Sequence, residues 1–102
     1  MANISVQELK ERIDNGEKLN LFDVREPYEY EESNIPGAVN IPLSTVPAHI
    51  ADWETLKNQE IIMQCKSGGR SGVAQSLLVQ AGFTNVRNLE GGIMAWHTLN
   101  KS

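Results

Sequence analysis

The stretch Ile61-Ile62-Met63-Gln64-Cys65-Lys66-Ser67-Gly68-Gly69-Arg70-Ser71 decides the fold of this chain of 102 residues. An apolar run ends at the only cysteine, a short loop with two glycines follows, and a helical pattern then extends to Gly82. Short apolar runs bounded by glycine are typical of buried strands. The stretch therefore predicts a strand, a tight loop and a helix, with a thiol at the start of the loop.

The loop after Cys65 has the composition of an anion-binding site. Gly68 and Gly69 adopt positive φ at no steric cost, so successive backbone N–H groups can turn inward and form an anion nest. The positive end of the following helix adds to this nest. Because helix N-termini and nearby cations lower the pKa of cysteine, we expect Cys65 to be a thiolate.

The charge distribution supports the same interpretation. Between Glu60 and Glu90 there is no Asp or Glu, and the cations in this segment are Lys66, Arg70 and Arg87. The whole chain, by contrast, has a net charge of −4. A lone cysteine is usually a small buried hydrophobe. A positively charged segment centred on a cysteine and two glycines favours a nucleophile beside an anion site instead.

Length and composition limit the class of protein. We expect one domain over residues 1–102, and a hydrophobic share of 40% with 22% charged residues is ordinary for a soluble globular protein. No apolar stretch approaches the roughly 20 residues that span a bilayer, and no signal peptide is visible. One cysteine forms no internal disulfide, so we expect a reducing compartment, the cytoplasm. The acidic net charge argues against nucleic-acid binding, and we expect no membrane association.

The rest of the chain alternates between strand and helix signals. A capping box at Ser5 and Glu8 predicts a helix that ends at Asn15-Gly16. Further elements are predicted as a strand over 19–24, a helical turn at Pro27, a strand over 39–41, a short helix after Ser44, strands over 61–64 and 86–89, and a closing helix over 93–99 with Trp96 in the core. Glu29, Glu31 and Glu32 are expected on a solvated helix face.

Alternating strands and helices indicate an α/β structure around a parallel sheet. Ligands of such sheets bind beyond the carboxyl ends of the strands. Asp23, Cys65 and Glu90 each lie at or near such an end in this prediction. We assign Asp23 and Arg25 to the architecture of the site floor, and neither histidine, His49 or His97, has metal-ligand spacing.

Four blocks of the chain resemble the rhodanese family of sulfurtransferases. The blocks are Leu21-Phe22-Asp23-Val24-Arg25-Glu26, Asn34-Ile35-Pro36-Gly37-Ala38-Val39-Asn40-Ile41-Pro42, Cys65-Lys66-Ser67-Gly68-Gly69-Arg70-Ser71, and Leu89-Glu90-Gly91-Gly92-Ile93 with Trp96. They occur in the family's order and cover nearly the whole chain. One departure is Ser33-Asn34, where the family usually has Gly-His, and this position belongs to a structural turn.

The resemblance implies a mostly parallel five-stranded sheet flanked by helices on both faces. It implies a sulfurtransferase that moves sulfane sulfur from thiosulfate or a persulfide to a thiol or cyanide, through a persulfide on catalytic Cys65 and without a cofactor or metal. The substrate-binding residues would be Lys66, Ser67, Gly68, Gly69, Arg70 and Ser71. Expected partners are a small-molecule sulfur donor and a thiol acceptor, with a thioredoxin-like or desulfurase protein as the macromolecular candidate.

Three other functions remain open from the sequence. A phosphatase or arsenate reductase is disfavoured, since four residues separate Cys65 from Arg70 and related phosphatases have five. A non-turnover persulfide relay or an interaction module of the same fold is the second alternative. Redox sensing by Cys65 is the third, although no second cysteine is present to resolve a sulfenic acid.

Overall fold

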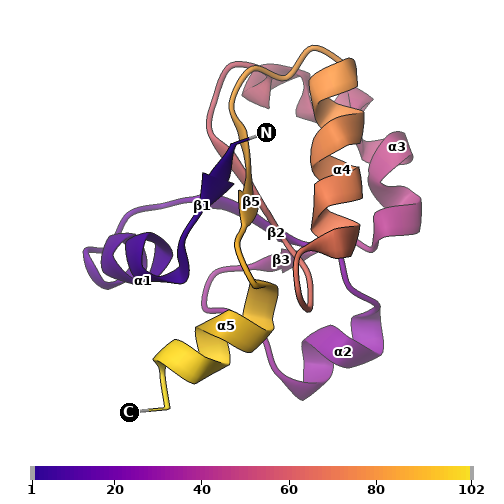
Figure 1. Cartoon of the computed structure of the whole chain (residues 1–102). Helices are drawn as coiled ribbons and strands as arrows, with labels where there is room; N and C mark the ends of the chain where they lie inside the picture. The colour runs from indigo at the N-terminus through magenta and orange to yellow at the C-terminus, as the bar shows by residue number, and fades with distance from the viewer. Residues whose placement is uncertain (1, 102) are drawn as a thin grey trace.

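The computed structural model describes residues 2–101, and its centre is a five-stranded parallel sheet (Figure 1). The strands lie in the order β1-β5-β4-β2-β3, and all four pairings are parallel. Their bounds are β1 Asn3–Ile4, β2 Asn20–Asp23, β3 Val39–Asn40, β4 Ile61–Gln64 and β5 Val86–Leu89. The α/β prediction and the four strands placed from the sequence are confirmed. The first strand was not placed, because two residues give no periodic signal.

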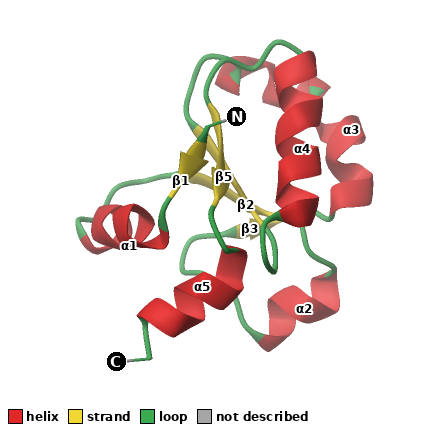
Figure 2. Ribbon diagram, viewed as in Figure 1, coloured by secondary structure: helices red, strands yellow, loops and turns green. Residues whose placement is uncertain are grey.

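Helices cover both faces of the sheet (Figure 2). Their bounds are α1 Val6–Asp14, α2 Pro27–Glu32, α3 Val46–His49, α4 Gly69–Gln80 and α5 Gly92–Leu99, with 3-10 helices η1 Leu43–Thr45 and η2 Ala51–Leu56. Side chains alternate along a strand, so β4 sends Ile61 and Met63 into one core and Ile62 into the other. The first core packs against α3, η2 and α4, and the second against α1 and α5.

Most helix boundaries follow the local signals. The Ser5 side chain accepts a hydrogen bond from the Glu8 N–H at 3.1 Å, and Pro27 is the first residue of α2, as predicted. The short helix predicted after Ser44 is present as α3, but Ser44 does not cap it: Thr45 is its N-cap, and Ser44 lies inside η1. The backbone then bends at Trp53 inside η2, because its φ/ψ of −96° and 16° is not helical.

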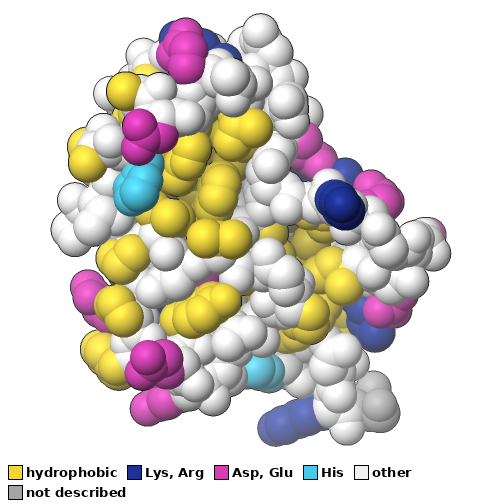
Figure 3. Space-filling view, turned by 180° about the vertical axis from the view of Figure 1, so that it is seen from behind, with side chains coloured by type: hydrophobic (Ala, Val, Ile, Leu, Met, Phe, Trp, Pro, Cys, Tyr) yellow, Lys and Arg dark blue, Asp and Glu magenta, His cyan; other side chains and the backbone are white. Residues whose placement is uncertain are grey.

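Part of the apolar side-chain surface is not covered by other residues. From behind, hydrophobic side chains reach the surface across the middle of the molecule (Figure 3). Partly buried hydrophobic residues pack against the core that contains Trp53, among them Ile41, Leu43, Ile50 and Leu56. No helix within residues 2–101 is long and apolar enough to cross a membrane.

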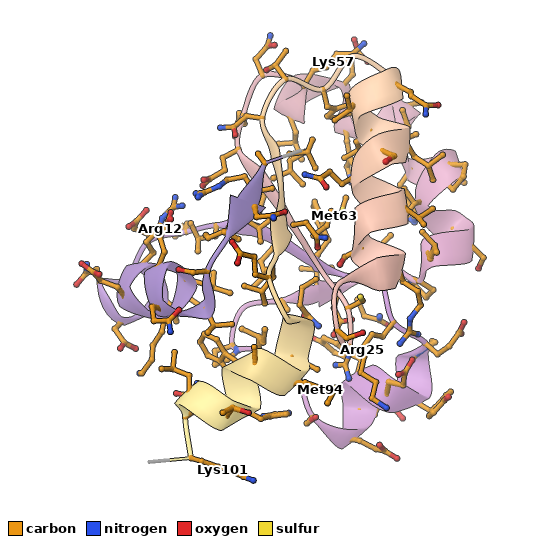
Figure 4. All side chains as sticks on the ribbon, in the orientation of Figure 1. Arg12, Arg25, Lys57, Met63, Met94 and Lys101 are labelled. Atoms are coloured by element: carbon orange, nitrogen blue, oxygen red, sulfur yellow. The ribbon has the colours of Figure 1, made fainter. Side chains whose placement is uncertain are left out.

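The predicted grouping of Arg87 with the cysteine loop was wrong. Arg87 lies on β5, and its guanidinium binds Glu8 of α1 at 2.7 and 3.0 Å and Glu60 at 3.1 Å. Arg12, which Figure 4 labels on α1, binds both oxygens of Glu60 at 2.9 and 2.6 Å. These four side chains tie α1 to the sheet. Their positive charges are therefore part of a structural ion-pair network and do not reach the loop.

This network predicts a loss of stability in acid. Hydrogen bonds from Arg12 and Arg87 lower the pKa of Glu60 from its usual 4.5. The ionised Glu60 therefore contributes fully to the unfolding free energy above pH 4.5, and this contribution is lost as the pH falls through the lower folded-state pKa. We expect Glu60→Gln to lower the unfolding free energy at pH 7 by about 1–2 kcal/mol, and to reduce the stability lost between neutral and acidic pH.

Urea unfolding at a series of pH values measures both effects. Glu11→Gln is the matched control, because Glu11 is an exposed carboxylate on α1. An equal acid dependence in the wild type and Glu60→Gln would show that this carboxylate does not carry the effect.

Candidate functional site: the cysteine loop

Cys65 lies at the carboxyl end of the central strand, where the sequence placed it. Its side chain is only 1% exposed and packs with the core that includes Met63 and Ala74. The register aligns Asp23 with Gln64 and Met63 with Asn88, so the ends of β2, β4 and β5 meet at this edge. Of the predicted loop residues, Lys66, Ser67 and Gly69 are exposed, Gly68 and Arg70 are half-buried, and Ser71 is buried.

Hydrogen-bond donors of the loop face the sulfur. The Gly68 N–H donates to Cys65 Sγ at 3.1 Å, and Ser71 Oγ lies 3.3 Å from the same atom. Gly68 takes φ +114° as the residue before α4, a conformation that favours glycine. The inward-facing amide expected at Gly68 is present, whereas Gly69 does not have the expected positive φ, because it is already the first residue of α4.

These donors outweigh the burial of the thiol. Burial opposes the thiolate, whereas the Ser71 hydroxyl and the backbone N–H groups of Ser71, Gly68 and Ser67 favour it. The net result is a lowered pKa for Cys65. The hydrogen bonds of the loop therefore favour the thiolate form of Cys65.

Asn88 supports this arrangement and was not identified from the sequence. Its Nδ2 donates to the Gly68 carbonyl at 3.0 Å, and its Oδ1 lies 2.5 Å from Ser71 Oγ. A serine hydroxyl has one proton, so Ser71 donates to either Asn88 or Cys65 at a given moment. Asn88 thus contacts Gly68 and Ser71, two of the residues that donate to the sulfur. No sequence pattern marks Asn88, because its position at the site follows from the register of β5 against β4.

The end of the chain holds the loop from the other side. At the start of α5, the Ile93 N–H donates to the Cys65 carbonyl at 2.9 Å and the Met94 N–H donates to the Lys66 carbonyl at 3.1 Å. Figure 4 shows Met94 on the turn of α5 nearest the loop. With their carbonyls bound to α5, these peptide units leave the following N–H groups of the loop free to face the sulfur. Gly92 allows this close approach, because a Cβ there would lie 2.5 Å from the Cys65 carbonyl oxygen.

Gln64 adds a second bond to the same carbonyl. Its side chain is fully buried, and its Nε2 donates to the Cys65 carbonyl at 2.9 Å. Its Oε1 has no hydrogen-bond partner among residues 2–101. The Cys65 backbone is therefore fixed from both the strand and α5.

The predicted floor residues form a buried ion pair. Arg25 Nη2 lies 2.7 Å from Asp23 Oδ2, and Arg25 also donates to the Ser33 carbonyl at 2.7 Å. Asp23 is fully buried and Arg25 is 4% exposed. Both act in the architecture, which links β2 to the turn after α2. No group of three His, Cys, Asp or Glu side chains suited to a metal ion occurs within the described residues.

One contact differs from the sequence-based expectation. Glu29 was expected on a solvated helix face, but its carboxylate binds Arg70 through two hydrogen bonds of 2.7 and 3.1 Å. The Glu29 side chain is only 16% exposed as a result. The pairing links α2 to the first turn of α4, and 41 residues separate the partners, so no local pattern could reveal it.

Hydrogen bonding of Cys65 by Ser71 gives a direct prediction. A hydrogen bond to a charged group contributes about 1.5–3 kcal/mol, and about 1.4 kcal/mol corresponds to one pKa unit. We expect Ser71→Ala to raise the Cys65 pKa by about one unit. The rate of alkylation by iodoacetamide, measured against pH, should then reach its midpoint at a higher pH. Ser44→Ala, an exposed serine, is the control, and an unchanged midpoint in Ser71→Ala would contradict the assignment.

A cysteine with a lowered pKa thus lies in a donor-lined loop at the end of the parallel sheet of an α/β domain. The family model of the rhodanese-like domain matches residues 5–99. The chain belongs to this family.

Relatives of the chain carry names from sulfur chemistry. It is 41% identical over 94% of its length to YrkF of Bacillus subtilis, which is named as a sulfur carrier protein, and spans 51% of that protein. It is 39% identical to the thiosulfate sulfurtransferase PspE of Escherichia coli, over 69% of this chain and 67% of PspE. The human single-domain sulfurtransferase TSTD1 has a similar structure, with a TM-score of 0.82, 30% identity and coverage of 100% and 98% of the two chains.

Proposed function

We propose that the chain is a sulfurtransferase in which Cys65 carries sulfane sulfur as a persulfide. The observation that supports this best is the ring of donors around Sγ: the N–H groups of Ser67, Gly68 and Ser71 and the Ser71 hydroxyl. Family membership supports sulfur transfer as the general chemistry. The names of the relatives describe those proteins, and the donor and acceptor of this chain are part of the proposal.

The reaction has two covalent steps. The Cys65 thiolate attacks the outer sulfur of the donor, a bond from Sγ to that sulfur forms, and the donor's S–S bond breaks. The leaving group departs with its electron pair, as sulfite from thiosulfate or as a thiolate from a persulfide. A thiol or cyanide then attacks the terminal sulfur, and Cys65 leaves as the thiolate. The steps are balanced and need no external oxidant.

The loop has a defined role in each step. Its N–H groups stabilise charge on the thiolate and on the terminal sulfur of the persulfide, and they are preorganised by α5 and Asn88. We assign Lys66, Ser67, Gly68, Gly69, Arg70 and Ser71 to donor binding. With four residues between Cys65 and Arg70, the loop makes a ring suited to one sulfur atom and too small for a phosphate.

The proposed partners follow from the chemistry of the two steps. They are a small-molecule sulfur donor and a thiol acceptor, and a thioredoxin-like or desulfurase protein is the macromolecular candidate. The similarity to a protein named as a sulfur carrier supports a relay of this kind.

Intact-mass analysis tests the proposal. Incubation with thiosulfate, or separately with a small persulfide, should add the mass of one sulfur atom to the chain, and cyanide should remove it as thiocyanate. Folded protein that no donor loads would overturn the proposal. Turnover of an aryl phosphate without loading would favour the phosphatase alternative instead.

A further inference from the structure

The side chain of Arg70 is already occupied at the site. Its two terminal nitrogens bind the two oxygens of Glu29, and Glu29 Oε1 also accepts the Glu26 N–H at 3.0 Å. An arginine binds an oxyanion best through the same two parallel hydrogen bonds. An oxyanion donor would therefore have to displace Glu29 before it could bind both terminal nitrogens of Arg70.

The ion pair persists at neutral pH. Hydrogen bonding from Arg70 lowers the pKa of Glu29 to about 2. Glu29 consequently stays ionised across the range in which the Cys65 thiolate exists, and it cancels the charge that Arg70 would otherwise offer.

The other charged side chains near the loop do not give its surroundings a net positive charge. The Glu26 carboxylate interacts electrostatically with Arg70. Glu90 is exposed, and it lies two residues before Gly92, whose Cα packs against the Cys65 and Lys66 backbone. Lys66 is exposed and makes no ion pair with any residue that the structure describes. Apart from the buried Asp23–Arg25 pair, the charged side chains near the loop are thus two cations and three carboxylates. Figure 1 shows α2, the source of Glu29, beside the loop and the start of α4.

We infer that Glu29 is a specificity-determining residue that directs the site toward persulfides with neutral or cationic organic groups and against dianionic donors such as thiosulfate. The inference rests on the proposed function, whose first step then becomes attack of Cys65 on the terminal sulfur of R–S–SH, with R–S⁻ as the leaving group. Glu29 acts through Arg70 and through its own charge, and it does not touch the reacting atoms.

Glu29→Gln tests this assignment. Glutamine keeps the length and the hydrogen-bond acceptor but removes the charge that holds Arg70. We expect the second-order rate constant for loading by thiosulfate to rise about tenfold. Thiosulfate is then no longer repelled by the Glu29 charge and can bind the freed Arg70, and a gain of about 1.4 kcal/mol corresponds to that factor. Loading by cysteamine persulfide should instead fall by about twofold or more, because its cationic group loses the attraction of the Glu29 charge.

Glu31→Gln is the matched control, since Glu31 is an exposed carboxylate on the same helix. Removing it changes the net charge equally without freeing Arg70, so the rate with thiosulfate should stay close to that of the wild type. An equal rise in both variants would show that net charge alone acts and would overturn the role of the Glu29–Arg70 pair.

The wild type provides a test that needs no variant. Cysteamine persulfide and 3-mercaptopropionate persulfide differ in the charge of the organic group, and each rate is divided by the rate of the same donor with free cysteine. The cationic donor should load Cys65 several-fold faster. Faster loading by the anionic donor or by thiosulfate would overturn the inference while leaving the sulfurtransferase proposal intact, whereas no loading by any donor would overturn the proposal itself.

Discussion

A Gly92→Ala variant is expected to lose both stability and sulfur loading. A Cβ at this position would lie 2.5 Å from the Cys65 oxygen and from the carbonyl carbon and oxygen of Lys66. These are backbone atoms, so no flexible side chain can move aside. Gly92 also has φ +57°, which is unfavourable for alanine by about 1–2 kcal/mol. With about 1–3 kcal/mol for overpacking, we expect a loss of about 3 kcal/mol in unfolding free energy.

The loss of loading has a separate cause. Relief of the clash requires α5 to move away from the loop, and the Ile93 and Met94 N–H groups would then release the Cys65 and Lys66 carbonyls. The loop N–H groups would no longer be held toward the sulfur, so the Cys65 pKa should rise. Urea unfolding and the pH profile of iodoacetamide alkylation measure the two effects.

Gly69→Ala is the stability control for this experiment. A Cβ at Gly69 would have no heavy atom within 4 Å outside its own turn of helix, and the residue has no positive φ, so alanine should be tolerated there. A Gly92→Ala variant as stable as the Gly69→Ala variant would show that the contact between α5 and the loop is loose.

Cys65→Ser is expected to abolish loading while keeping the fold. The serine hydroxyl fits the same donors, the Gly68 N–H and the Ser71 hydroxyl, but it is not ionised at neutral pH and forms no persulfide. The adduct of one sulfur atom should be absent from the mass spectrum with every donor. The thermal midpoint should stay within a few degrees of the wild type, since a single substitution without a cavity or an unpaired polar group has a small effect.

The thermal midpoint distinguishes a reactive cysteine from a structural one. Cys65 is buried among apolar side chains such as Met63 and Ala74, so a purely structural cysteine would leave serine poorly accommodated. A large drop in the midpoint of Cys65→Ser would point to a structural role for the buried cysteine. Ala74→Ser provides a matched comparison, because it introduces a hydroxyl in the same core without the loop donors.

The parts of the fold that are encoded locally were predicted well. The strand before Cys65, the glycine loop and the helix after it depend on neighbouring residues, and so does the cap at Ser5. The strand Asn3–Ile4 was missed because it exists only through pairing with β5.

The parts of the site that depend on distant partners were not predictable. Arg70 and Arg87 look equivalent in the sequence, yet one meets Glu29 at the loop and the other meets Glu8 of α1. Asn88 contacts Ser71 only because β5 lies next to β4. Charge counting along the chain therefore overestimated the positive potential of the loop.

The burial of Cys65 has a consequence for labelling experiments. With 1% of the residue exposed, the thiol is shielded by the protein from bulky electrophiles, whereas iodoacetamide is small. A persulfide places its terminal sulfur about 2 Å farther out along an S–S bond. Large maleimide reagents should thus discriminate by size, reacting with the sulfur-loaded form and sparing the empty one, and so report the loading state in a mixed population.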